Sequence, residues 1–152
     1  MLRPIWRLAT ISSADRSATL TLTLLVPLVS LSLTVLGFRR TLGWLARTAN
    51  LPSRIGGPEH VVQLGVAAMG RVRRYTPWTG RCLARALSLW WVLRRRGIDA
   101  KLNLGARVRD GVLDAHAWVT HQGAILADSN SVGADFPATF QAGNDLVFTR
   151  DR

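Results

Sequence analysis

The N-terminal part of the chain holds a long run of apolar and hydroxyl residues without charge. No charged residue occurs between Ser17 and Phe38, where leucine is interspersed with threonine and serine. The run is long enough to span a bilayer, but Pro27, the hydroxyl residues and the arginines on both sides make a poor insertion sequence. We expect a helix docked on the rest of the protein or on a partner, with membrane contact as the less favoured alternative. The alternation of Leu and Thr from Thr19 to Leu25 would also suit a strand.

A connection rich in helix breakers follows. Residues 50–57 contain one proline and two glycines, which favour an irregular segment. This connection predicts a boundary between an N-terminal helical segment, residues 1–50, and a second part, residues 58–152.

Two further helices are predicted in the second part. Pro58 suits the first turn of a helix, and apolar residues at helical spacing continue up to Arg74. The next helix is expected to begin with Thr79 as its cap and to end at Gly97, directly after three arginines.

The periodicity changes from helical to strand-like after Gly97. Apolar and polar residues alternate over residues 100–108, 113–120 and 124–128, and Asp110-Gly111 marks a tight turn between the first two runs. Helices followed by hairpins predict an α+β fold.

The turn residues also predict the register of the first hairpin. A two-residue Asp-Gly turn pairs Arg109 with Val112 and places Gly105 directly opposite His116. A glycine at that position leaves room beside the imidazole ring.

The second hairpin has two candidate registers. A two-residue turn would put Asp128 opposite Ala117, on the wrong face of the strand for a contact with His116. A three-residue loop from His121 to Gly123, with its glycine in the left-handed conformation, instead pairs His116 with Asp128. Side chains of directly opposed residues have Cβ atoms about 5 Å apart. We therefore predict the three-residue loop.

Composition limits the classes of function. The 152 residues suit one domain with a modest core. Twenty basic and nine acidic residues give a net charge of +11, but the aromatic-basic stripes and motifs of nucleic-acid binders are missing. The charge suits an acidic peptide or an anionic membrane surface, or simply a solvated arginine-rich surface. A single cysteine allows no internal disulfide and favours a reducing cytoplasm.

That single cysteine is the candidate nucleophile. Cys82 falls in the first turn of a predicted helix, where exposed amide groups and the helix dipole favour a negatively charged sulfur. His116 and Asp128 follow on predicted strands, in an order that suits a thiol, a general base and an orienting carboxylate. The plainer alternative is a small buried residue without chemistry, which is common for a free cysteine.

No metal or cofactor is expected. His60 near a helix start and His121 in a turn lack the spacing of metal ligands. The chain also lacks a glycine-rich phosphate loop of the Walker type, so nothing supports nucleotide binding.

Several motifs resemble those of a known family in identity, order and spacing. They are Arg81-Cys82-Leu83, the run from Ala86 to Ile98, Leu104-Gly105, Ala115-His116-Ala117-Trp118-Val119 and Asp128. In these the chain resembles the lasso peptide biosynthesis B2 proteins, which are transglutaminase-like cysteine peptidases. The resemblance implies a transglutaminase-like or papain-like core over residues 58–152, in which a helix bearing Cys82 packs on an antiparallel sheet bearing His116 and Asp128. The N-terminal helical segment precedes this core.

The resemblance also implies a function. Such a peptidase removes the leader from a ribosomally made lasso precursor peptide, so that a separate ATP-using macrocyclase can close the core peptide. Cys82 would attack the scissile carbonyl, His116 would act as base and then acid, and Asp128 would hold the imidazole. The chain has no room for a leader-recognition domain before its catalytic part, so we expect a separate B1 partner. The expected location is the cytoplasm, with peripheral membrane contact as a variant.

Two other functions stay open. The same three residues can pass an acyl group to an amine, as a transglutaminase does, and only the products distinguish the two reactions. A noncatalytic binding or membrane scaffold is the third interpretation. It has no physical need for Cys82, His116 and Asp128 together, so their presence argues against it.

Overall fold

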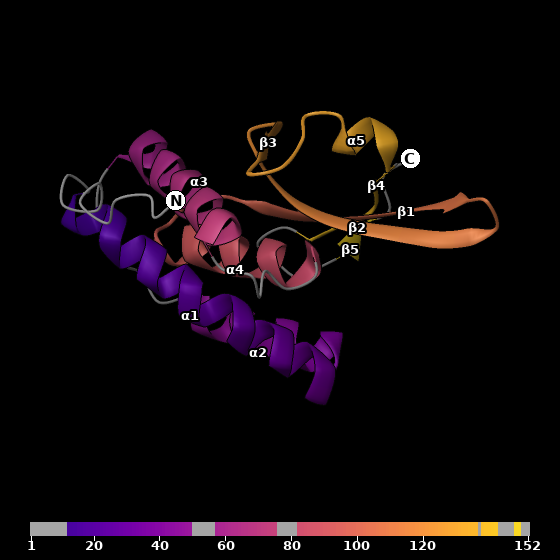
Figure 1. Ribbon diagram of the computed structural model, residues 1–152, viewed down its shortest axis with the longest axis horizontal. Coiled ribbons are helices and arrows are strands. Elements are labelled where there is room, and N and C mark those ends of the chain that lie inside the picture. The colour runs from indigo at the N-terminus through magenta and orange to yellow at the C-terminus, as the bar shows by residue number, and fades with distance from the viewer. Residues whose placement is uncertain (1–11, 50–56, 76–81, 137, 143–147, 150–152) are drawn as a thin grey trace, which may run out of the picture.

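The computed structural model is an α+β protein, described here over residues 12–49, 57–75, 82–136, 138–142 and 148–149. Helices pack against an antiparallel sheet with the strand order β3-β2-β1-β4-β5 (Figure 1). In chain order the elements are α1 (Ser13–Val35), α2 (Phe38–Ala49), α3 (Pro58–Tyr75), α4 (Cys82–Arg95), β1 (Lys101–Arg109), β2 (Val112–His121), β3 (Ala124–Leu126), α5 (Val132–Asp135), β4 (Ala138–Ala142) and β5 (Phe148–Thr149).

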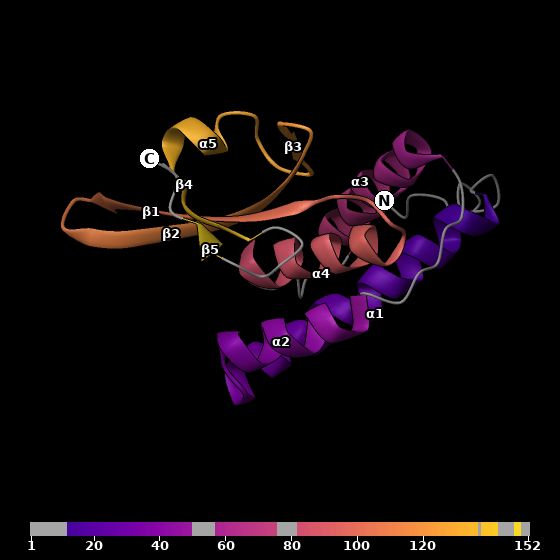
Figure 2. The same cartoon turned by 180° about the vertical axis from the view of Figure 1, so that it is seen from behind.

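Helix α4 is the centre of the molecule. It contacts β1 and β2 of the sheet and also α1, α2 and α3, and in both views it lies between the sheet and the helices α1 and α2 (Figures 1 and 2). Its side chains from Ala86 to Trp90 are all buried, which is typical of a helix that is enclosed on every side. Gly97, with φ of 79°, ends it as predicted. The cap expected at Thr79 lies outside the described residues.

The N-terminal run forms a helix, so the strand alternative is wrong. Ser12 caps α1 by accepting a hydrogen bond from the amide of Asp15. Nη1 of Arg71, on α3, donates hydrogen bonds to Oδ1 of Asp15 at 3.0 Å and to Oγ1 of Thr19 at 3.2 Å. The buried face of α1 belongs to the same apolar core as α4 and β2, so α1 packs on the rest of the protein. The predicted boundary at residues 50–57 lies outside the described residues except for Gly57.

Within the described residues, α1 is also long and apolar enough to cross a membrane. The mean hydropathy of its most apolar 18-residue window is 1.9, and 28% of that window is buried. Length and composition alone do not distinguish a spanning helix from a core helix, so the packing of α1 has to decide between them.

The first hairpin has the predicted register. Asp110 and Gly111 form a two-residue turn with φ of 51° and 76°, and Gly105 lies opposite His116. A Cβ at Gly105 would lie 2.9 Å from three atoms, the Cβ and carbonyl oxygen of Phe136 and Cη2 of Trp118. The room that the glycine leaves is therefore filled by two aromatic residues.

The predicted register of the second hairpin is wrong. β2 and β3 pair Val119 with Leu126 and His121 with Ala124, so that the turn contains two residues and not three. Gly123 has the expected positive φ of 82°, but Gln122 is also left-handed, with φ of 49°. Two successive left-handed residues form the type of turn that matches the twist of a hairpin. Gln122 adopts the left-handed conformation here, although glutamine has no special preference for that conformation. β3 ends at Leu126, before the expected end of the strand at residue 128.

We predict that Gly105→Ala destabilises the fold by about 1–3 kcal/mol, because the new methyl group would overlap a backbone carbonyl that cannot move away like a flexible side chain. Gly43→Ala in α2 is the matched control, since a Cβ there meets nothing within 4 Å. Chemical denaturation of both variants measures the change. Equal stability of the two variants would contradict the close approach at Gly105.

Candidate active site

The structure brings His116 and Asp128 together. Nε2 of His116 lies 2.8 Å from Oδ2 of Asp128, and their side chains are 21% and 24% exposed. A carboxylate only accepts hydrogen bonds, so Nε2 is the donor in this contact, and in a neutral imidazole Nδ1 then keeps its lone pair. Nδ1 of the neutral ring can therefore accept a proton, as the acting atom of a general base must.

The contact arises from a break in β3. Continued pairing in the observed register would place Asp128 opposite Ala117, whose side chain lies on the other face from His116. Ala127 instead has φ of 57°, a left-handed conformation that is uncommon outside glycine and asparagine. The chain leaves the strand at this residue and turns the carboxylate of Asp128 to the imidazole. The amide of Ser129 donates to Oδ1 of the same carboxylate at 2.9 Å.

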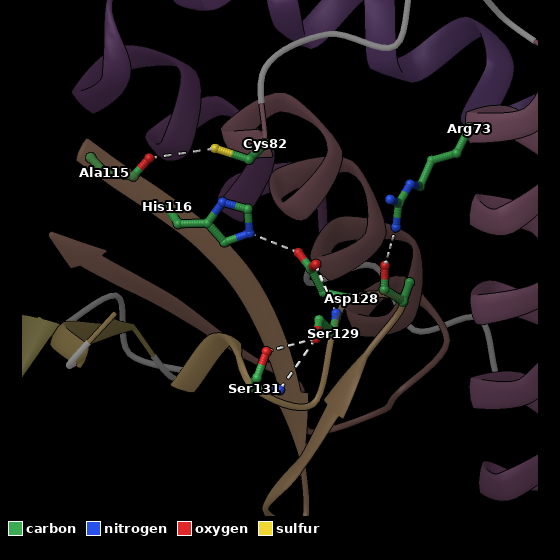
Figure 3. A network of polar contacts seen from close by, with 8 residues as sticks. Arg73, Cys82, Ala115, His116, Asp128, Ser129 and Ser131 are labelled. Atoms are coloured by element: carbon green, nitrogen blue, oxygen red, sulfur yellow. Dashed lines mark hydrogen bonds and ion pairs between the residues drawn. The ribbon is translucent and has the colours of Figure 1, made fainter. Parts of the chain in front are cut away.

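Arg73 of α3 holds this break in place. Its Nη1 donates to the carbonyl oxygen of Ala127 at 3.1 Å (Figure 3). The arginine thus ties α3 to the residue that turns the chain just before Asp128. Nothing in the spacing of the sequence connects these two positions, which are 54 residues apart, and sequence reasoning missed both of them.

Two aromatic rings fix the plane of the imidazole. Phe136, just after α5, stacks with His116 at 5.2 Å between ring centroids, and Trp118 stacks at 6.3 Å. The guanidinium of Arg107 lies 4.0 Å above the Phe136 ring, on which it makes a cation-π contact. The sequence placed Trp118 on the same face as His116, but it gave no signal for Phe136.

Cys82 lies close by, at the beginning of α4. Its thiol is partly buried and donates to the carbonyl oxygen of Ala115 at 3.9 Å, a weak hydrogen bond to the residue before His116. Figure 3 shows the imidazole between Cys82 and Asp128, with Nε2 turned to the carboxylate and Nδ1 turned to the side of Cys82. The described contacts of the thiol do not include a hydrogen bond to His116. All three predicted residues therefore lie in one site, with a direct contact between two of them.

The thiol reaches the strand because β2 has an open edge there. The pairing between β2 and β3 ends at Val119, so that Ala115 and His116 lie beyond the end of β3. A small cleft is lined by Cys82 and Asp128, by Arg73 and Arg85, and by apolar side chains of α3, α4 and the β2–β3 hairpin. Cys82 and Asp128 thus line one cleft, and His116 is not among its lining residues.

The other histidines lie elsewhere. His121 is the last residue of β2, and its Nδ1 pairs with the carbonyl oxygen of Asp99 at 2.8 Å. His60 is exposed on α3. In the described part of the chain, no three His, Cys, Asp or Glu side chains are grouped as metal ligands.

We predict that His116→Ala slows alkylation of Cys82 by iodoacetamide about tenfold or more near neutral pH, because the imidazole can no longer take the thiol proton. The chain has one cysteine, so the total adduct measured by mass spectrometry reports on this site alone. His121→Ala is the control, since His121 bonds to Asp99. An unchanged rate in His116→Ala would show that the imidazole does not assist the sulfur.

Arg73→Ala should slow the same alkylation by roughly three- to tenfold, because loss of one hydrogen bond of about 1 kcal/mol loosens Ala127 and with it Asp128. Arg74→Ala removes the same charge from the next, exposed position of α3 and should leave the rate unchanged. If both variants behave alike, the effect is one of net charge, and Arg73 has no positioning role.

Comparison with models of protein families identifies the superfamily of the chain. A model described as the transglutaminase-like superfamily matches residues 25–141, a segment that includes Cys82, His116 and Asp128. Neither the comparison with curated proteins nor that with solved structures gives a significant match. The match covers more than half of the chain, and the fold of helices on an antiparallel sheet agrees with it. The chain belongs to the transglutaminase-like superfamily.

Proposed function

We propose that the protein is a cysteine peptidase that removes the leader from a lasso precursor peptide. Membership of the transglutaminase-like superfamily implies cysteine peptidase or acyltransferase chemistry. The observation that carries the proposal is the His116–Asp128 contact of 2.8 Å beside the single cysteine. The resemblance to B2 proteins in the motifs around Cys82 and His116 supplies the substrate class.

The reaction begins at the thiol. Rotation of the Cys82 side chain away from the carbonyl of Ala115 brings its proton to Nδ1 of His116, and the sulfur attacks the scissile carbonyl carbon. The tetrahedral oxyanion then accepts hydrogen bonds from backbone N–H groups at the start of α4, including that of Cys82, because the first amides of a helix have no intrahelical acceptor.

The imidazolium next donates its proton to the leaving amine, and the peptide bond breaks to leave a thioester on Cys82. Water enters, gives a proton to Nδ1 and attacks the thioester carbonyl, so that the leader leaves as a carboxylate and the thiol regains its proton. Asp128 stays ionised throughout, and it stabilises the imidazolium in both halves of the reaction.

The partners and the location are part of the proposal. We expect a separate B1 protein to present the leader, a macrocyclase to consume the freed core peptide, and the reaction to occur in the cytoplasm. The net charge of +11 and the two arginines in the cleft favour a peptide that carries acidic residues. Neither a cofactor nor a nucleotide enters the steps above.

Acyl transfer to an amine is the alternative reaction of the same residues. The two reactions differ only in the group that attacks the thioester. Incubation of a candidate precursor with the protein, with and without B1 and with an added primary amine, followed by mass spectrometry, separates them. A free leader carboxylate supports the peptidase, whereas an amide to the added amine would favour the acyltransferase.

We expect Cys82→Ala to abolish cleavage, with a loss of about a thousandfold or more, and His116→Ala to be nearly as damaging. Asp128→Asn should cost less than Asp128→Ala, because an amide oxygen can still accept the hydrogen bond from Nε2. The fold of each variant is checked by circular dichroism. Cleavage by Cys82→Ala would refute the nucleophile, and full activity of Asp128→Ala would remove Asp128 from the site.

A further inference from the structure

The outer face of α1 is apolar although it is exposed. Its residues recur at intervals of three or four positions, which places them along one side of the helix, and they are between 50% and 73% exposed. This outer stripe consists of Leu20, Leu24, Leu28, Leu31 and Val35. The opposite face of α1 is buried in the core, so the helix has apolar side chains on two opposite faces, a property that is typical of a helix covered on both sides.

Several threonine hydroxyls of α1 are hydrogen-bonded within the helix. Thr21 and Thr34, both on exposed positions, donate to the carbonyl oxygens of Ser17 and Ser30 one turn earlier, and Thr23 does the same to Thr19. Hydroxyls that are satisfied within their own helix lower the cost of an apolar environment. The sequence alone suggested that the threonines oppose contact with lipid. With their hydroxyls bonded within the helix, they do not.

The charges around the stripe select its partner. Residues 12–49 contain four arginines and one acidic residue, and this residue, Asp15, is paired with Arg71 at 3.0 Å. Arg16 is exposed before the start of the stripe, and Arg39 and Arg40 are exposed after its end. On α2, Arg40 and Trp44 share a face at a spacing of four residues, and Trp44 is 42% exposed. Apolar stripes with flanking arginine and tryptophan are typical of helices that lie at an anionic membrane surface.

The packing of α1 argues against a spanning arrangement. Its inner face contacts α3 and α4, and the Asp15–Arg71 ion pair ties its first turn to α3. Only the outer stripe is available, so α1 would lie in the plane of the membrane surface. We propose that the outer stripe of α1, with the exposed arginines of α2, is a docking surface for an anionic lipid bilayer.

This orientation leaves the candidate active site accessible. α1 and α2 lie on the opposite side of α4 from β3 and α5 in both views (Figures 1 and 2). Asp128 follows β3, and Phe136 follows α5, so the segments that carry these two residues lie away from the proposed lipid surface. The proposed lipid-binding face is therefore separate from the candidate active site, and lipid binding does not depend on the proposed function.

Co-sedimentation of the full-length protein with vesicles tests the proposal. We expect binding to phosphatidylcholine vesicles that contain phosphatidylglycerol, weaker binding to phosphatidylcholine alone, and a decrease with added salt. The double variant Leu24→Gln/Leu31→Gln should bind about tenfold more weakly or worse, because two leucine side chains that the bilayer would bury are lost while the charge is kept. Leu20→Gln/Val35→Gln, at the two ends of the stripe, should act in the same direction.

The matched control is Val108→Gln/Leu113→Gln. These two residues are 72% and 70% exposed at the tip of the β1–β2 hairpin, so the substitutions remove exposed apolar side chains away from α1, and binding should be unaffected. Arg39→Gln/Arg40→Gln should weaken binding to the anionic vesicles and leave the weak binding to neutral ones as it is.

Four results would overturn the proposal. The first is absence of vesicle binding, and the second is binding that both stripe variants retain, which would indicate charge attraction alone. The third is resistance of the bound protein to carbonate extraction, which would indicate insertion. The fourth is a dimer in solution that the stripe variants dissociate, which would make a second copy of the chain the occupant of the stripe. Sedimentation equilibrium of the wild-type protein and the variants detects the dimer.

Discussion

The strict alternation of side chains along a strand is the constraint that shapes the site. In the observed register His116 and Asp128 could not meet if β3 continued, because the carboxylate would project from the other face of the sheet. One left-handed residue, Ala127 with φ of 57°, resolves the conflict by ending the strand. A non-glycine residue in this region costs of order 1 kcal/mol or more. The hydrogen bond from Arg73 and those to Asp128 offset that cost, so the strain is localised where the carboxylate is positioned.

The same break produces the access that the chemistry needs. Because β3 pairs with β2 only from Val119 onward, the strand edge at Ala115 stays open to α4, and the thiol of Cys82 reaches a backbone carbonyl there. Had β3 continued along β2, it would have occupied the position from which the sulfur approaches. Orientation of the imidazole and exposure of the strand edge to the nucleophile therefore have one structural cause.

Much of this arrangement could be predicted from local sequence. The Asp110-Gly111 dipeptide fixed the first hairpin, because both residues readily adopt the left-handed conformation, and the position of Gly105 opposite His116 followed from simple counting. The second hairpin could not be obtained in this way, since Gln122 has no strong preference for the turn that it adopts. The prediction contained two errors, a three-residue loop in place of a two-residue turn and an unbroken strand through Asp128. The two errors cancelled at Asp128, so the predicted contact between His116 and Asp128 was nevertheless right.

The contacts between distant segments could not be predicted from the sequence for a different reason. Arg73 meets Ala127 and Phe136 meets His116 through tertiary packing, and neither contact leaves a periodic trace in the chain. The threonines of α1 illustrate the opposite case, in which a residue type was given the wrong physical meaning. Threonine is polar in composition counts, yet a hydroxyl that donates to the carbonyl one turn earlier presents mainly its methyl group to the surroundings. The polarity of a helix therefore depends on where its hydroxyl protons point, which composition cannot specify and the structure can.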